Sequence, residues 1–135
     1  LGEGEQRVVL EKRIAELDLG SVVDLPGFCK NPYLLMQSAD LYVLPSLWEG
    51  LPTVLIEALL FCKNIVATDC VSGPREILKD GLYGRLVEPG NETALQQAML
   101  QELRSSGVRD GMQNRALDFS VERASKKYKA FLEGL

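Results

Sequence analysis

The sequence has 135 residues, of which 46% are hydrophobic and 25% are charged, a balance typical of one globular domain with its own core. No apolar stretch approaches the roughly 20 residues needed to cross a bilayer, and the N-terminus lacks the basic, apolar and small-residue sections of a signal peptide. The formal net charge of -4 argues against a nucleic-acid partner, because such a partner requires a basic stripe on the protein.

Short apolar segments alternate along the chain with segments in which apolar residues recur at helical spacing. In chain order, these patterns predict a helix over 5–18, a strand over 21–27, a helix over 31–39, a strand over 41–46, a helix over 52–61, a strand over 64–68, a helix over 74–80, a strand over 83–90, a capped helix ending near 103, and helices over 108–118 and 120–133. Several of these strands are apolar throughout, which indicates a parallel sheet with helices on both faces. We therefore predict a Rossmann-like α/β domain.

Residues with a preference for helix ends mark several of these boundaries. Asn31 followed by Pro32 has the form of an N-cap with proline at the first helical position. Gly73 and Pro74 repeat that arrangement before the helix over 74–80. Asn91 is expected to cap the helix that ends near 103.

The N-terminal residues LGEGEQRVV have the form of a strand, a glycine turn and a helix start, but only Leu1 is left of the strand. We infer that residues 1–135 are one domain of a larger protein, truncated at its N-terminus. An uncovered sheet edge would favour self-association of such a piece.

The three cysteines, Cys29, Cys62 and Cys70, are odd in number and form no C-x-x-C pair, and the chain contains no histidine. A disulfide scaffold and a zinc site are therefore disfavoured. No cluster of acidic residues lies at a strand end where it could bridge a divalent ion to phosphates, so we predict no bound metal. Because nothing directs the chain to the secretory path, we expect a cytoplasmic location.

Two glutamates, Glu49 and Glu57, lie eight residues apart in the segment PSLWEGLPTVLIEALLF. In a parallel α/β sheet, ligands bind at the carboxyl ends of the strands, where loops lead into helix N-termini. Glu49 lies in such a loop. The helix that follows should present unpaired N–H groups at Leu51, Thr53 and Val54, which favour a phosphate.

Glu57 is the only charged residue between Gly50 and Phe61, so we expect the helix to be buried and the carboxylate to need partners. Two neighbouring ribose hydroxyls would satisfy it. At ~1.5 Å per residue, the eight-residue offset spans roughly 12 Å, about the reach from the ribose to the sugar ring of a nucleotide diphosphate sugar. Two plainer interpretations stay open: Glu57 reaches solvent, and Glu49 is a first-turn carboxylate favoured by the helix dipole.

These segments together resemble the group-one glycosyltransferases, retaining enzymes of the GT-B fold that use nucleotide sugars. The resemblance covers nearly all of the chain and is carried, in order, by GEG, LPGF, NPYLLMQSADLYVLPS, EGLPTVLIEAL, VATDCVSGPREIL, DGLYGRLVEPGN and FSVERASKKY. It implies the C-terminal, nucleotide-sugar-binding half of a GT-B enzyme, with the acceptor-binding domain absent. It also implies transfer of a sugar from a nucleotide diphosphate sugar, with UDP the expected carrier, to a glycan or lipid-linked acceptor, as in cell-surface polysaccharide biosynthesis.

The resemblance assigns roles by position. Glu49 matches the catalytic-site glutamate that contacts hydroxyls of the transferred sugar, and Glu57 matches the ribose-binding glutamate. The backbone of Cys29 falls where the family meets the nucleobase. The loop around the sugar and diphosphate is matched by Gly50, Leu51, Pro52, Thr53 and Val54. The family's diphosphate-binding Arg and Lys lie in a region that precedes this sequence, so the chain alone is expected to be inactive.

Other functions remain as alternatives. A sugar phosphorylase or a nucleotide-sugar epimerase shares the architecture, but the first needs a pyridoxal lysine and the second needs catalytic carboxylates in both domains. A non-catalytic nucleotide-binding or protein-interaction module of Rossmann-like fold is the alternative from another class. Within the glycosyltransferase interpretation, peripheral attachment of the full-length protein at the inner face of the membrane stays open.

Overall fold

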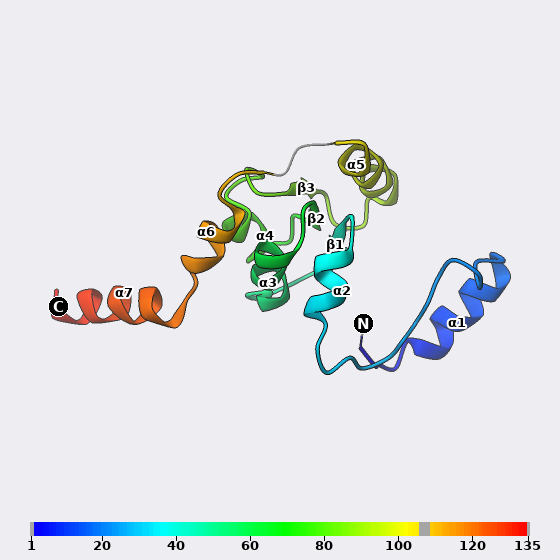
Figure 1. Ribbon diagram of the computed structural model, residues 1–135, viewed down its shortest axis with the longest axis horizontal. Helices are drawn as coiled ribbons and strands as arrows, with labels where there is room; N and C mark the ends of the chain where they lie inside the picture. Colours follow the sequence, from blue (N-terminus) through cyan, green and yellow to red (C-terminus); the bar gives the residue numbers. More distant parts are fainter. Residues whose placement is uncertain (1, 106–108, 135) are drawn as a thin grey trace. The chain divides into compact units, whose positions relative to one another are not determined.

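The computed structural model of the protein describes residues 2–105 and 109–134 and divides into two compact units, Leu1–Leu34 and Leu35–Leu135 (Figure 1). The helices are α1 (Arg7–Glu16), α2 (Tyr33–Ser38), α3 (Thr53–Phe61), α4 (Pro74–Ile77), α5 (Glu92–Arg104), α6 (Met112–Leu117) and α7 (Val121–Glu133). The strands are β1 (Tyr42–Leu44), β2 (Ile65–Thr68) and β3 (Arg85–Val87). Among the described residues, no helix combines the length and apolar character needed to cross a membrane.

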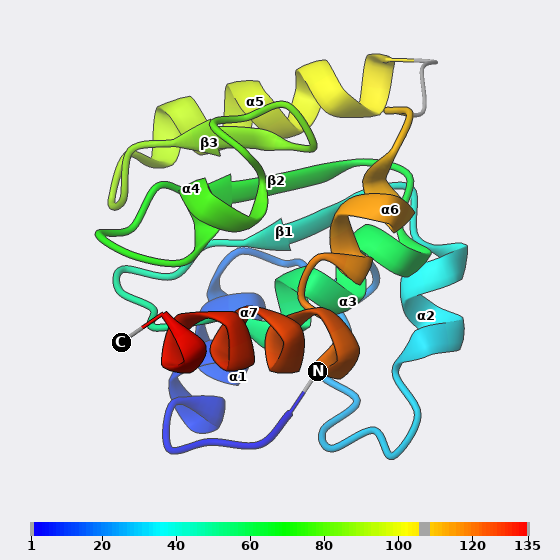
Figure 2. The ribbon, with the colours of Figure 1, turned by 90° about the vertical axis from the view of Figure 1, so that its left-hand side faces the viewer.

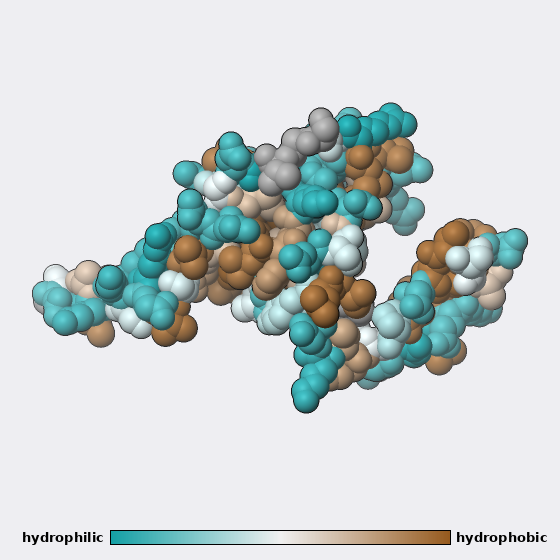
Figure 3. Space-filling view, viewed as in Figure 1, coloured by the Kyte–Doolittle hydropathy of each residue, from teal (hydrophilic) through white to brown (hydrophobic). Residues whose placement is uncertain are grey.

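In the first unit, α1 has no buried residue and exposes apolar side chains, which are brown in Figure 3. The strand predicted over 21–27 is wrong, because this segment is irregular. The N–H groups of Val22 and Val23 donate to the carbonyl of Leu19 at 3.0 and 2.9 Å, a turn that removes them from any sheet. The carbonyl of Gly27 accepts one backbone bond, from Gly2 N–H at 2.8 Å.

The second unit contains a parallel sheet in the order β1-β2-β3. All four residues of the central strand β2 are buried, as its uninterrupted apolar sequence predicts. Figure 2 shows α5 on one side of the sheet and α3 on the other. Helices on both faces of a parallel sheet confirm the predicted Rossmann-like α/β class.

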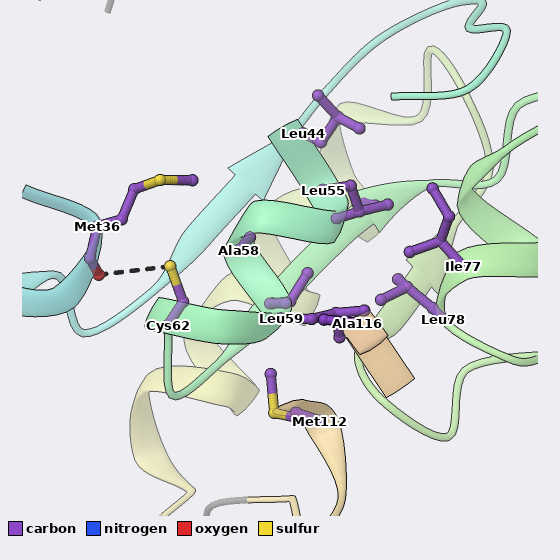
Figure 4. Packing of buried hydrophobic residues seen from close by; sticks show 12 residues of the cluster. Met36, Leu44, Leu55, Ala58, Leu59, Cys62, Ile77, Leu78, Met112 and Ala116 are labelled. Atoms are coloured by element: carbon purple, nitrogen blue, oxygen red, sulfur yellow. Dashed lines mark hydrogen bonds between the residues drawn. The ribbon is translucent and has the colours of Figure 1, made fainter. Parts of the chain in front are cut away.

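The main core lies on the face of the sheet that carries α3. Leu55, Ala58 and Leu59 of α3 are at most 1% exposed, and they pack with Ile77 and Leu78 at α4 (Figure 4). A smaller cluster joins β2, β3 and α5 through Val66, Val87 and Ala98. The core therefore fixes α3 firmly against the sheet, and with it the loop that enters α3.

Helix boundaries follow local backbone chemistry. Asn91 caps α5 as predicted, because its Oδ1 accepts from Ala94 N–H at 2.9 Å. α4 ends before 80, since Lys79 and Asp80 adopt positive φ angles of 49° and 55°. α6 begins only after Gly111, which has a left-handed φ of 84°; residue 108, where that helix was predicted to start, lies outside the described residues.

A buried ion cluster joins α5 to β3 and to the segment before α6. The side chain of Glu102 is 2% exposed, and both of its oxygens accept from Arg109, at 2.6 and 2.8 Å. Arg85 Nε adds a bond to Glu102 Oε1 at 3.1 Å. The bonds from Arg109 hold the pKa of Glu102 below its usual value, although burial acts in the other direction.

Glu102→Gln is expected to lower the free energy of unfolding by about 2 to 3 kcal/mol at pH 7, because it removes the negative charge from a buried ion pair. The loss is limited because both arginines keep access to solvent. The lowered pKa means that the contribution of Glu102 is fully present above its unfolded pKa of about 4.3 and is lost as pH falls through the folded value. Urea unfolding from pH 7 downward measures this.

Glu5→Gln is the matched control, since Glu5 is exposed and makes no hydrogen bond or ion pair within the described residues. The stability gap between Glu102→Gln and the unmodified protein should shrink as the solution is acidified. A gap that stays constant with pH would show that the charge on Glu102 contributes nothing.

Candidate functional site

Glu49 lies in the loop between β1 and α3, at the carboxyl edge of the sheet. Its carboxylate is half-buried and accepts a hydrogen bond from Ser46 Oγ to Oε1 at 2.7 Å. No N–H group of α3 donates to this carboxylate within the described residues. The side chain is therefore not a helix cap, and its other oxygen, Oε2, is left for an outside partner.

The loop that carries Glu49 is fastened to the end of β2. The carbonyl of Ser46 accepts from the hydroxyl of Thr68 and, at 3.1 Å, from the thiol of Cys70. Further along, Ser72 Oγ donates to the carbonyl of Glu49 at 2.8 Å. Three side chains that follow one another on or after β2 thus hold the neighbouring loop in place.

A glycine allows the two loops to approach so closely. Gly73 has a φ of 91°, and a Cβ at this position would lie 2.5 Å from Pro52 Cδ and 2.6 Å from the carbonyl oxygen of Gly50. No real side chain tolerates such distances from backbone atoms. Gly73 is therefore needed both for its backbone angle and for the contact between the loops.

The N-terminus of α3 is open. Pro52 occupies the N-cap position and supplies no side-chain cap. Leu55 N–H donates to the carbonyl of Pro52 at 2.9 Å, but the N–H groups of Leu51, Thr53 and Val54 have no backbone partner within the described residues. These donors and the positive end of the helix dipole favour an anion here.

Glu57 lies further along α3 and is half-buried, so the expectation of a buried carboxylate is wrong. The reason is that α3 buries only one side: Val54 and Leu60 on the same helix are 43% and 37% exposed. Within the described residues, the Glu57 carboxylate makes no hydrogen bond or ion pair. Burial raises the pKa of Tyr42 to about 12, with further contributions from Cys62 and from the charges of Glu57 and Glu49.

The spacing argument for the two glutamates also needs correction. α3 begins at Thr53, so only the second half of the interval from Glu49 to Glu57 is helical. A helical rise does not apply to residues 49–52, and the roughly 12 Å estimated from it does not describe this pair. What remains is a loop carboxylate before the helix and a half-exposed carboxylate on it.

The three cysteines differ in their surroundings. Cys29 is half-buried and belongs to the first unit, whereas the loop with Glu49 belongs to the second, so its role at a nucleobase stays a prediction. Cys62 is buried and its thiol donates to the carbonyl of Met36 at 3.3 Å (Figure 4). Burial raises the pKa of Cys62 to about 11, which keeps the thiol protonated and inert.

Sequence reasoning missed Ser46, Thr68, Cys70 and Ser72. Each is a small polar residue at the end of an apolar strand, and that position is the one signal that could have drawn attention to them. Which carbonyl Thr68, Cys70 and Ser72 each donate to depends on the register of β1 and β2, whereas Ser46 donates to the Glu49 carboxylate. Within residues 2–105 and 109–134, no group of three or more acidic, cysteine or histidine side chains could hold a metal.

The chain matches a known family and known structures. The profile of the family described as "Glycosyl transferases group 1" matches residues 1–119. An uncharacterized glycosyltransferase of Methanocaldococcus jannaschii, MJ1059, is 32% identical over an alignment that covers 99% of this chain and 41% of the relative.

The N-acetylgalactosamine-N,N'-diacetylbacillosaminyl-diphospho-undecaprenol 4-alpha-N-acetylgalactosaminyltransferase of Campylobacter jejuni is 38% identical, covering 86% of this chain and 32% of the relative. Among solved structures, Anabaena Alr3699/HepE in complex with UDP superposes with a TM-score of 0.78 and 25% identity, covering 95% of this chain and 36% of that one. The chain thus spans less than half the length of the relatives it matches.

Gly73→Ala is expected to destabilise the second unit by about 2 to 3 kcal/mol, since it adds a clash with Pro52 to an unfavourable backbone angle. Gly90→Ala is the matched control, because Gly90 has a similar φ of 77° and open space around it. Thermal unfolding of both variants separates the clash from the backbone term. Equal losses in the two would show that the contact between the loops is not needed.

Proposed function

Because this chain belongs to the group 1 glycosyltransferase family, we propose that it is the donor-binding domain of a retaining glycosyltransferase. The full protein transfers a sugar from a nucleotide diphosphate sugar to a glycan or lipid-linked acceptor. Residues 1–135 form the C-terminal, nucleotide-sugar-binding domain, and another part of the protein binds the acceptor.

The observation that carries this proposal is the pairing of an uncapped helix N-terminus with a carboxylate that does not cap it. Glu49 precedes the open N–H groups of Leu51, Thr53 and Val54, yet its carboxylate bonds to Ser46. A carboxylate that served only the helix dipole would accept from those N–H groups. The donors and the acceptor are instead both available to a ligand that carries an anion and hydroxyls side by side.

The roles divide along the donor. The N–H groups of Leu51, Thr53 and Val54 hold the diphosphate, and the hydroxyl of Thr53, which is exposed at the start of α3, adds a donor. Glu49 accepts hydrogen bonds from hydroxyls of the transferred sugar. Glu57 accepts hydrogen bonds from ribose hydroxyls. This role agrees with a half-exposed carboxylate that has no partner in the described part of the chain.

The reaction requires the protein to stabilise a leaving diphosphate. As the bond between the anomeric carbon and the diphosphate oxygen breaks, negative charge grows on that oxygen. The fixed N–H dipoles at the α3 N-terminus stabilise this charge. Cationic side chains elsewhere in the full protein complete this stabilisation. The anomeric carbon forms its new bond to a hydroxyl oxygen of the acceptor, the proton of that hydroxyl passes to the leaving diphosphate, and the configuration at the anomeric carbon is retained.

Two comparisons support particular partners. The Anabaena protein is described in complex with UDP, which supports a UDP-sugar as the donor here. The name of the Campylobacter relative describes a diphospho-undecaprenol acceptor, which supports a lipid-linked glycan as the acceptor. For the location, our proposal is the one that the sequence predicts, cytoplasmic and peripheral at the inner face of the membrane. No cofactor is assigned to the reaction, and the nucleotide sugar is its donor substrate.

Glu57→Gln in the full-length protein should weaken UDP binding at least tenfold, because charge-assisted bonds to ribose hydroxyls contribute on the order of 1.5 to 3 kcal/mol. Since Glu57 is half-exposed, the fold should survive. Calorimetry with UDP and with GDP measures the change, and Glu76→Gln, an exposed glutamate on α4, is the control. Unchanged affinity for the preferred nucleotide would assign Glu57 to solvent and refute its role at the ribose.

Glu49→Ala should lower the turnover of the full-length protein by roughly tenfold to a hundredfold, because the lost charge-assisted contact is to the sugar. Binding of bare UDP should change by less than about twofold, since UDP does not contain the sugar. Steady-state kinetics and calorimetry on the same preparation give the two numbers. Equal losses in turnover and UDP binding would refute the division of roles between Glu49 and the helix N-terminus.

A further inference from the structure

Ser46 is the one residue whose side chain bonds to the Glu49 carboxylate within the described part of the chain. We propose that Ser46 is a positioning residue, which holds this carboxylate in the orientation that receives a hydroxyl of the donor sugar. The proposal rests on the function proposed above for Glu49, and it adds a residue that the family resemblance did not assign.

The hydrogen bond leaves the carboxylate both fixed and usable. An ionised carboxylate offers about four acceptor sites, and Ser46 Oγ occupies one of them, on Oε1, at 2.7 Å. Oε2 has no partner among the described residues. Without the serine hydroxyl, the three side-chain torsions of Glu49 would be free to move before the donor arrives, and part of the binding energy would be lost in ordering them.

Ser46 is itself held by buried donors from the central strand. Its carbonyl accepts from Thr68 and Cys70, and both of these side chains are 3% exposed. The Thr68 hydroxyl also lies 3.2 Å from the carbonyl of Leu44 and shares its single proton between two acceptors, so the Cys70 thiol provides the second donor. A continuous path of hydrogen bonds therefore runs from the buried end of β2 through Ser46 to Glu49.

The backbone of Glu49 is held separately. Ser72 Oγ donates to the carbonyl of Glu49 at 2.8 Å, and this bond fixes the main chain without touching the carboxylate. Removing the Ser46 hydroxyl should therefore release the side chain of Glu49 and leave the loop in place. That separation makes the contribution of the serine measurable, because a loop that stays in place still binds the nucleotide.

The test compares Ser46→Ala, Glu49→Ala and the double variant in the full-length protein. The probes are UDP for binding and, for turnover, release of UDP from whichever of UDP-galactose, UDP-glucose and UDP-N-acetylgalactosamine the unmodified protein hydrolyses fastest. Ser46→Ala should lower kcat about tenfold, the loss expected for a hydrogen bond to a charged group. The Kd for UDP should stay within about twofold.

The double variant separates positioning from general support of the loop. If Ser46 acts through Glu49, adding Ser46→Ala to Glu49→Ala changes kcat by less than about twofold. Ser38→Ala is the control, because Ser38 Oγ also donates a hydrogen bond but to a backbone carbonyl, that of Leu35 on α2, and not to a carboxylate. This control should retain the kcat of the unmodified protein.

Several results would overturn the proposal. Ser46→Ala with unchanged kcat, or with the same fold-loss when Glu49 is already alanine, would remove the positioning role while leaving the function of Glu49 intact. Glu49→Ala with unchanged kcat would instead refute the proposed role of Glu49, and with it this proposal. Should Ser46→Ala fail to fold, Ser46→Cys supplies the comparison, since a thiol of similar size is a weaker donor and should lower kcat severalfold.

Discussion

The contact between two loops at the carboxyl edge of the sheet is the constraint on which the site depends. Parallel strands place the ends of β1 and β2 at the same edge, but a shared edge alone does not bring their loops together. Gly73 does so, because only a residue without a Cβ fits against Pro52 and the carbonyl of Gly50. Given that contact, the side chains following β2 reach the carbonyls of the loop that carries Glu49.

Two kinds of carboxylate coexist in this domain, and their partners separate them. Glu102 is almost fully buried and forms ion pairs with two arginines. Its charge therefore holds α5 to β3 and to Arg109. Glu57 is half-exposed and has no such partner in the described residues. Since the charge of Glu57 has no partner that would stabilise the fold, we propose that it accepts hydrogen bonds from the hydroxyls of a ligand.

The architecture could be predicted from the sequence because apolar runs are a local signal, and β2 and α3 carry it strongly. The strand expected over 21–27 failed because strand formation depends on a partner, and Leu19 captures the N–H groups of Val22 and Val23 instead. The loop and N–H groups before α3 were predictable from strand order. The bonds from Cys70 to Ser46 and from Ser72 to Glu49 were not, since they join segments more than twenty residues apart in a register that no local pattern reveals.

An uncapped N-terminus makes α3 less stable than a capped one would be, and this uncapped end follows the loop that carries Glu49. Serine, threonine or aspartate in place of Pro52 would satisfy a helix N–H and add about 1 kcal/mol, and Glu49 itself could have turned its carboxylate toward those donors. Both options are left unused: Pro52 has no side-chain acceptor, and the Glu49 carboxylate accepts a hydrogen bond from Ser46 instead. We propose that a helix start without either cap keeps its N–H groups for the diphosphate of a ligand, and that the bond from Ser46 leaves Glu49 Oε2 for the hydroxyls of a sugar.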